Sequence, residues 1–281
     1  MAQLHLRGMA LGEVQAVLFD KDGTLSISEP QLLTLAKARV FLCLEQVEVA
    51  LRPPLQDLLE RAYGLTNNGQ GLCPAGTTAV ATRDHNLIST ATALAQVGVG
   101  WPDALAISES VFAEADQLDA RRAQHQGHRP TQGAPSSTRA PGSTSTPSST
   151  SAATPGLVTL LEQLQAKNVR CAVISNDDIA GIEHFLAHHQ LASYFSGLWS
   201  AEHRPRKPDP AAVHGLCAEL KVAVEHCVLI GDANSDLRMA VAAGIPHQRA
   251  LGYTAAWSSP PPLAEPHPLI HHWEELTVLG E

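Results

Sequence analysis

Short apolar runs along the chain alternate with stretches whose apolar residues recur at helical spacing. The runs at residues 14–19, 169–174 and 227–230 are rich in Val, Ile, Leu and Phe, and apolarity of this length is typical of strands buried on both faces of a sheet. Residues 157–164 carry leucines at the spacing i, i+3, i+4, i+7, and residues 179–186 follow a similar stripe, as one face of a buried helix does. The alternation of strand and helix predicts an α/β core with a parallel sheet.

Between residues 26 and 124 the pattern changes, because helix-like segments follow one another without a convincing strand. These segments include 32–51 and 84–97. In the second, the apolar positions form a single stripe, and Asp84 is placed to cap the N-terminus. A loop of Gly, Asn and Thr at 65–82 precedes it. We therefore predict an inserted all-helical unit over residues 26–124.

The segment 131–155 contains neither an aromatic nor a large aliphatic side chain, and Arg139 is its only charge. Such a segment buries too little apolar surface to offset the entropy lost on ordering. We predict a flexible Ser/Thr/Pro-rich linker over residues 125–155 that returns the chain from the insert to the core. A mucin-like stalk is the alternative. The α/β core then comprises residues 1–25 and 156–281.

Composition limits the partners and the compartment. The 281 residues are 44% apolar and carry 28 acidic against 19 basic side chains, which gives a formal charge of −9. This balance argues against a nucleic-acid or anionic-membrane surface. Five scattered cysteines without a CxxC pair favour neither a disulfide framework nor a zinc site. Because no apolar run of about 18 residues and no N-terminal export signal is visible, we expect a cytoplasmic protein.

The first predicted strand ends in the motif DKDGTL at residues 20–25. In an extended segment, carboxylates at i and i+2 point the same way, and Gly23 permits a sharp turn. Asp20 is therefore placed to attack phosphorus and form an acyl phosphate, and Asp22 to protonate the leaving oxygen and later deprotonate water. The alternative is a strand followed by an ordinary Asp-Gly turn.

Two later motifs supply groups that bind anions. Ser175 and Asn176 follow the second strand where a helix begins, and a hydroxyl beside the N–H groups of a helix start makes a seat for an anion. The alternative there is an ordinary helix cap. Lys207 lies in the sequence RKPDP at 206–210, where prolines would fix the loop and the ammonium would hold a phosphoryl group. The alternative for Lys207 is a solvated surface residue.

The fourth motif, GDANSD at residues 231–236, follows the third strand. Asp232 and Asp236 are candidates for a metal ligand and its support, against the alternative of a helix cap with an acidic first turn. If the motifs converge where parallel strands end, Asp232 and Asp236 lie close to Asp20 and Asp22. Their negative charges then repel one another unless a cation lies among them. All-oxygen ligands beside phosphate favour Mg²⁺ over Ca²⁺.

The ordered set DxDGT, Ser, KPDP and GDxxxD resembles the haloacid dehalogenase-like (HAD) hydrolase superfamily, specifically phosphatases with a helical cap of the C1 type between the first two motifs. The resemblance covers about residues 14–25 and 156–275. It implies a Rossmann-like parallel sheet flanked by helices, with the inserted all-helical unit as a cap domain. Lys21 departs from the apolar residue that is commoner between the two aspartates, without removing a catalytic group.

The resemblance assigns roles position by position. It implies that Asp20 is the nucleophile and Asp22 the general acid/base. The side chains expected to bind the phosphoryl group are Thr24, Ser175, Asn176 and Lys207. The aspartates expected at the Mg²⁺ site are Asp20, Asp22 through its backbone carbonyl, Asp232 and, supporting metal-bound water, Asp236.

We therefore expect a Mg²⁺-dependent phosphomonoester hydrolase that acts on a small phosphorylated metabolite, such as phosphoglycolate or a sugar phosphate, through a phosphoaspartyl intermediate. Arg83, Asn67 and Asn68, in or beside the glycine-rich loop of the cap, are candidates to contact that substrate. Two alternatives stay open. One is a phosphomutase or phosphotransferase, in which a substrate hydroxyl accepts the phosphoryl group. The other is a catalytically silent module that binds a phosphometabolite. Neither nucleic acid nor a membrane is expected as a partner.

Overall fold

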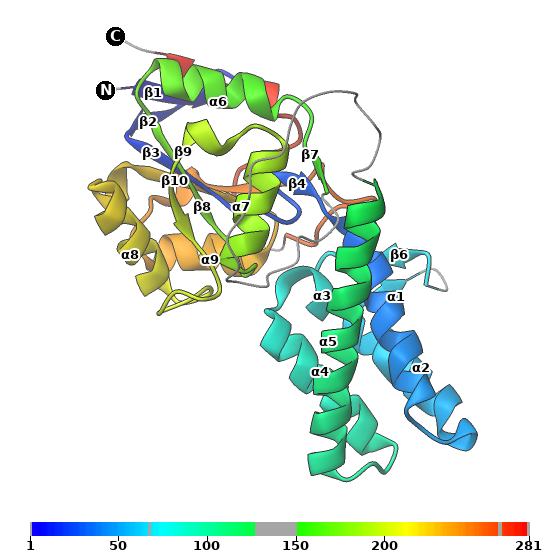
Figure 1. Cartoon of the computed structure of the whole chain (residues 1–281). Helices are drawn as coiled ribbons and strands as arrows, with labels where there is room; N and C mark the ends of the chain where they lie inside the picture. The colour runs from blue at the N-terminus through cyan, green and yellow to red at the C-terminus, as the bar shows by residue number, and fades with distance from the viewer. Residues whose placement is uncertain (1, 67–68, 127–150, 264–265, 280–281) are drawn as a thin grey trace, which may run out of the picture.

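A six-stranded sheet forms the centre of the molecule (Figure 1). The computed structural model describes residues 2–66, 69–126, 151–263 and 266–279. The strands of the sheet are, in spatial order, β12 (Leu269–Ile270), β11 (Ala250–Tyr253), β10 (Cys227–Gly231), β3 (Ala16–Phe19), β8 (Arg170–Ile174) and β9 (Phe195–Trp199). Each neighbouring pair in this order is parallel. The predicted α/β class is confirmed.

Side chains of the central strands enter two apolar layers, because successive residues of a strand point to opposite faces. Val17 and Phe19 of β3 lie in one layer, and Ala16 and Leu18 lie in the other. The helices that cover the first layer are α6 (Leu157–Ala166) and α7 (Ile179–His188), and those that cover the second are α8 (Pro210–Leu220) and α9 (Asn234–Ala242). Burial on both faces explains why these strands are continuously apolar.

A three-stranded antiparallel sheet closes the first apolar layer near the chain termini (Figure 1). It consists of β13 (Leu276–Leu279), β1 (Ala2–Leu6) and β2 (Met9–Val14). Leu4 and Leu6 of β1 are buried in this layer. The apolar pattern does not predict this sheet, and it assigns Val14 to the first core strand. In the structure Val14 ends β2, and β3 begins at Ala16.

The insert between β3 and β8 folds beside the core as a helical unit, here named the cap (residues 29–126; Figure 1). Its helices are α1 (Glu29–Glu45), α2 (Arg52–Tyr63), α3 (Thr77–Val80), α4 (Arg83–Gln96) and α5 (Trp101–Gln126). They enclose an apolar core of their own, in which Leu55, Tyr63 and Phe112 are fully buried. Of the helices in the described ranges, none is long and apolar enough to cross a membrane.

Two details of the cap differ from the expectation. The strands β5 (Leu65–Thr66) and β6 (Gly71–Leu72) form a short antiparallel pair inside the expected loop. Thr82 caps α4 in place of Asp84, because the Thr82 hydroxyl accepts the N–H of His85. Asp84 lies one residue inside the helix, where its charge still favours the helix N-terminus.

The chain crosses between core and cap at two adjacent strands. β4 (Ser26–Ile27) leaves the core, β7 (Ala152–Ala153) returns to it, and the two pair in antiparallel orientation. Thr154 is buried beside them, with its hydroxyl 3.0 Å from the Thr24 carbonyl oxygen. Most of the linker expected over 125–155 lies outside the described residues. Its last part, from 151 to 154, belongs to this ordered crossing, and α5 extends two residues past the expected end of the cap.

Candidate active site

The ends of three neighbouring strands bring the sequence motifs to one edge of the sheet. β3 lies between β10 and β8, so Asp20, Asp232 and Ser175, which follow these strands directly, lie side by side. The N–H of Asp20 donates to the Ile230 carbonyl oxygen at 2.9 Å and extends the ladder one residue beyond β3. Ligands of parallel α/β sheets bind at this edge.

Lys207 connects two buried carboxylates. Its Nζ lies 2.7 Å from Asp20 Oδ1 and 2.7 Å from Asp236 Oδ1. The same atom donates to the Ile174 carbonyl oxygen at 3.3 Å. Burial acts to lower the pKa of Lys207, but the two carboxylates raise it above its ordinary value. The ammonium therefore stays charged beside Asp20.

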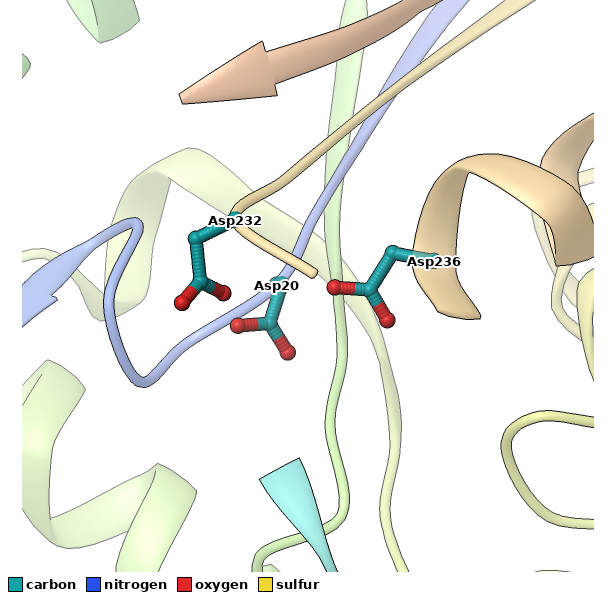
Figure 2. A group of neighbouring side chains, drawn as sticks. All are labelled: Asp20, Asp232 and Asp236. Carbon is teal, nitrogen blue, oxygen red and sulfur yellow. The ribbon is translucent and has the colours of Figure 1, made fainter. Parts of the chain in front are cut away.

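Asp20, Asp232 and Asp236 form the acidic cluster (Figure 2). One oxygen from each lies within 4.8 Å of the others, and all three residues are buried. Burial, against the opposing effect of Lys207, raises the pKa of Asp20 to about 7. Burial and then the charges of Asp20 and Asp236 raise the pKa of Asp232 well above its ordinary value. Crowded oxygen donors of this kind suit a hard divalent cation, so the residues present fit Mg²⁺.

The Asp22 carboxylate lies in a different set of contacts, centred on Lys21. Its Oδ1 accepts from Lys21 Nζ at 2.7 Å, from the Ser26 hydroxyl at 3.2 Å and from the Ser28 hydroxyl. Lys21 Nζ also lies 3.0 Å from Asp177 Oδ2. Burial acts to raise the pKa of Asp22, yet Lys21 and the two hydroxyls hold it below its ordinary value. Asp22 is therefore ionised in this arrangement.

A cavity of about 690 Å³ lies between the core and the cap, lined on the core side by the acidic cluster, Asp22 and Lys207. Its volume falls within the range typical of sites that enclose a small molecule. Two polar contacts join core to cap beside it. The Asn176 amide donates to the Val80 carbonyl oxygen at 3.2 Å, and Arg206 pairs with Asp84 at 3.2 Å.

The remaining residues expected to bind phosphate divide into two groups. Ser175 and Asn176 line the cavity, and the Ser175 hydroxyl accepts the N–H of Asp177 at 3.1 Å. Thr24 is fully buried and is not part of the cavity lining. Within the described residues, the Thr24 hydroxyl has no hydrogen-bond partner. The structure thus does not bring the Thr24 side chain to the cavity.

The cap side of the cavity carries two arginines that share one aspartate. Arg83 Nε and Nη2 lie 2.9 and 2.8 Å from Asp116 Oδ2. Arg39 Nη2 lies 3.5 Å from Asp116 Oδ1, and its guanidinium lies 3.8 Å from the centroid of the Phe112 ring. The sequence signalled Arg83 but not Arg39. The other cap residues expected to contact substrate, Asn67 and Asn68, lie outside the described residues.

Trp257 contacts the acidic cluster and Glu29 contacts the residue that follows Trp257, and neither carries a signal in the sequence. Trp257 follows β11, and its Nε1 donates to Asp232 Oδ2 at 2.6 Å. Glu29, at the start of α1, accepts the N–H of Ser258 at 2.7 Å. Trp257 lies 25 positions after Asp232, and Glu29 lies 229 positions before Ser258. Contacts at such separations depend on the folded chain and have no local pattern.

Comparison with known families decides the membership of the chain. The sequence profile of the haloacid dehalogenase-like hydrolases matches residues 14–244. The chain belongs to this family. The match includes each of the four motifs and the cap between the first two of them, so the resemblance drawn from the sequence is confirmed.

Curated relatives and solved structures agree with the family. The chain is 26% identical over 122 residues to a phosphoglycolate phosphatase from Photobacterium profundum, which is 43% of this chain and 53% of that protein. It is 29% identical over 117 residues to phosphoglycolate phosphatase 1 from Pseudomonas aeruginosa, 41% of this chain and 42% of that protein. The chain thus spans about half the length of the curated relatives it matches.

Two crystal structures resemble the whole chain. One is a predicted phosphoglycolate phosphatase from Haemophilus somnus 129PT, with a TM-score of 0.59 at 17% identity, covering 94% of this chain and 96% of that one. The other is a HAD-superfamily hydrolase from Geobacter sulfurreducens PCA, with a TM-score of 0.51 at 16% identity, covering 93% and 94%. At these identities the likeness establishes the fold of core and cap.

Proposed function

We propose that this hydrolase cleaves the phosphomonoester of a small metabolite, with Asp20 as the nucleophile. The observation that carries the proposal is the contact of Lys207 Nζ with Asp20 at 2.7 Å, at the core side of the cavity. An ammonium at this place can hold a phosphoryl group beside the carboxylate that attacks it. The cytoplasm is the compartment that we propose, on the sequence grounds given above.

In the first half of the reaction, an Asp20 oxygen bonds to phosphorus while the bond from phosphorus to the ester oxygen breaks. Lys207 and the Ser175 hydroxyl hold the phosphoryl oxygens. A proton from Asp22 passes to the departing ester oxygen, so that the product leaves as an alcohol. This step requires Asp22 in its protonated form, so Asp22 must take up a proton before the ester bond breaks, against the effect of Lys21 on its pKa.

In the second half, water attacks the phosphorus of the phosphoaspartyl group. Asp22 accepts a proton from that water, and the bond from phosphorus to Asp20 breaks, which releases inorganic phosphate and restores the carboxylate. The contacts of Asp22 with Lys21, Ser26 and Ser28 favour its ionised form. That is the form in which it can accept the proton.

We propose that Asp20, Asp232 and the backbone carbonyl of Asp22 hold Mg²⁺, with Asp236 in support. The bound ion supplies positive charge that offsets the repulsion between an anionic nucleophile and an anionic substrate. The acidic cluster supports this assignment, because its three buried carboxylates face a single ammonium.

For the substrate, we propose a phosphorylated metabolite with a second anionic group, for which phosphoglycolate is the first compound to test. Two observations support this choice. The curated relatives are named phosphoglycolate phosphatases. On the cap side of the cavity, Arg39 and Arg83 share the single carboxylate of Asp116, so one positive charge is left to meet an anion that points away from Lys207.

Two other functions of the same site can be tested. A phosphotransferase or mutase would pass the phosphoryl group from Asp20 to a substrate hydroxyl, so it would convert one phosphate ester into another with little free phosphate. A silent binding module would take up phosphometabolites with measurable heat but without turnover. The intact set of Asp20, Asp22, Lys207 and Asp232 favours catalysis over silence.

The decisive assay is release of inorganic phosphate from a panel of phosphate esters, with and without Mg²⁺. Asp20→Asn is the control, because it keeps the shape of the side chain and removes the nucleophilic charge. We expect release that depends on Mg²⁺ and is absent in Asp20→Asn. Equal release by the variant would refute the assigned nucleophile. No release from any ester would favour the transferase, or the silent module if calorimetry then detects binding.

A further inference from the structure

The indole of Trp257 makes a direct hydrogen bond to the acidic cluster. Its Nε1 donates to Asp232 Oδ2 at 2.6 Å, and both side chains are buried, with exposed fractions of 7% and 4%. A hydrogen bond from a neutral donor to a buried carboxylate is stronger than one between neutral groups. This hydrogen bond restrains one oxygen of the Asp232 carboxylate, and its donor comes from the segment that follows a different strand, β11.

Gly23 leaves the space that this hydrogen bond occupies. A Cβ at Gly23 would lie 2.3 Å from Asp232 Oδ2 and 2.4 Å from Trp257 Nε1, closer than any side chain tolerates. The backbone of the nucleophile motif therefore packs directly against the donor and the acceptor. The contact of Trp257 with Asp232 is enclosed from the Asp20 side as well, and its geometry has little freedom.

Glu29 holds the segment that carries Trp257. Glu29 Oε2 accepts the N–H of Ser258 at 2.7 Å, and Oε1 accepts the Ser258 hydroxyl at 2.8 Å. Oε1 also accepts the N–H of Leu72 in β6 of the cap at 3.2 Å. Glu29 is 7% exposed. A buried carboxylate at the start of the cap thus fixes the residue that follows Trp257.

We propose that Trp257, held in place by Glu29, is a positioning residue that sets the Asp232 carboxylate to bind the divalent cation. The inference rests on the proposed Mg²⁺ site and assigns to it a support that is not part of the four motifs. Hydrogen-bond partners of metal ligands orient them, and their removal typically weakens metal binding by about 10-fold to 100-fold. Loss of the indole N–H should therefore weaken Mg²⁺ binding by at least about 10-fold.

The test is calorimetric titration of Mg²⁺ alone into the full chain, without substrate. Trp257→Phe removes the N–H donor and keeps an aromatic ring. Trp273→Phe is the matched control, because Trp273 is also buried and its Nε1 donates at 2.8 Å to Thr154, away from the acidic cluster. We expect the Kd for Mg²⁺ to rise about 10-fold or more in Trp257→Phe and to stay near the wild-type value in Trp273→Phe.

Tryptophan fluorescence gives a second readout. Because Trp257 touches Asp232, Mg²⁺ should change the emission of the wild-type protein and of Trp273→Phe, and the change should be absent in Trp257→Phe. Because Trp257→Phe removes its own indole emission whatever the role of Trp257, the fluorescence of the wild type and of Trp273→Phe reports Mg²⁺ binding beside Trp257, and the Kd from calorimetry decides the role. An unchanged Kd in Trp257→Phe would overturn the inference while leaving the proposed function intact. A wild-type protein that binds no Mg²⁺ would overturn both.

Glu29→Gln keeps the test decisive if Trp257→Phe does not fold. An amide carries one NH2 group in place of an oxygen, so in either orientation it presents a donor to the N–H of Ser258 or of Leu72. We expect Glu29→Gln to loosen Trp257 and to raise the Kd for Mg²⁺ several-fold. A Kd equal to that of the wild type would count against the role of Glu29 and of the segment it holds.

Discussion

Lys207→Met is the substitution whose effect follows most directly from the geometry. Methionine keeps most of the length of the side chain and removes the ammonium that lies 2.7 Å from Asp20 and 2.7 Å from Asp236. Breaking a buried ion pair by removing one partner costs about 3–5 kcal/mol, because the other charge is left without compensation. At about 2 °C per kcal/mol for a chain of this size, the melting temperature should fall by roughly 6–10 °C in EDTA.

Lys21→Met is a matched control, because Lys21 is as deeply buried and also contacts two carboxylates, Asp22 at 2.7 Å and Asp177 at 3.0 Å. Both variants should lose comparable stability in EDTA. The melting temperatures of the two variants should differ in the presence of Mg²⁺. The carboxylates that Lys207→Met leaves unpaired belong to the acidic cluster, so Mg²⁺ should raise the melting temperature of this variant more than that of the wild type. For Lys21→Met, the Mg²⁺-dependent rise should match the wild type.

Thermal melts of the three proteins in EDTA and in Mg²⁺, followed by circular dichroism, make the comparison. Phosphate release by Lys207→Met should be lost in both conditions, since the ammonium that holds the phosphoryl group is gone. An equal melting temperature of Lys207→Met and the wild type in EDTA would contradict this prediction, as would an equal Mg²⁺-dependent rise in the melting temperatures of the two lysine variants.

Further outcomes follow from single residues. Since the pKa of Asp20 is raised from 3.8 to about 7, the folded, metal-free protein binds more protons than the unfolded chain between these values. The free energy of unfolding should therefore fall as the pH rises from about 4 to about 7, and it should fall less steeply in Asp20→Asn. Urea unfolding in EDTA measures both trends. Gly23→Ala should abolish Mg²⁺ binding in calorimetry. Gly8 has a similar φ of +82°, but a Cβ added there would meet nothing within 4 Å. Gly8→Ala should therefore lower the free energy of unfolding by only about 1–2 kcal/mol. Arg83→Gln should raise the KM for phosphoglycolate about 10-fold or more at similar kcat, and Arg61→Gln, on an exposed ion pair of α2, should leave steady-state kinetics unchanged.

The sequence predicts the central strands well because burial on both faces requires continuous apolar residues. β3, β8 and β10 lie in the middle of the sheet, and each has the run that their burial demands. The edge strand β12 has two residues, which is too short for a pattern. β11 is as short and as buried as β3, but its sequence, ALGY, contains a glycine and none of the Val or Ile that mark a buried strand. Their neighbours in the sheet determine them more than their own sequence does.

The residues of the site also divide into those that the sequence predicts and those that it does not. Asp20 and Asp232 follow predicted strands directly, so their meeting at one edge of the sheet follows from the strand assignment. Trp257, which contacts Asp232, and Glu29, which contacts Ser258, lie in segments that contain no motif, and hydrogen bonds across the folded chain place them. Thr24 lies inside a motif and is expected to bind phosphate. Its side chain is fully buried and does not line the cavity, so that role stays a prediction.

Lys21 departs from the commoner pattern of the motif, and its positive charge offsets part of the negative charge beside the cavity. Five of the carboxylates that line the core side of the cavity fall into two groups, each around one ammonium. Asp178 and Glu202 also line this side. Around Lys21, the carboxylates of Asp22 and Asp177 leave one negative charge when ionised. Around Lys207, the three carboxylates of the acidic cluster leave two. A divalent cation neutralises the second group, and without it burial favours proton uptake by Asp20 and Asp232, in the direction of their raised pKa values. Against the effect of burial, Lys21, with the hydroxyls of Ser26 and Ser28, holds the pKa of Asp22 below its ordinary value, and the negative charge of Asp22 in turn contributes to the raised pKa of Asp20.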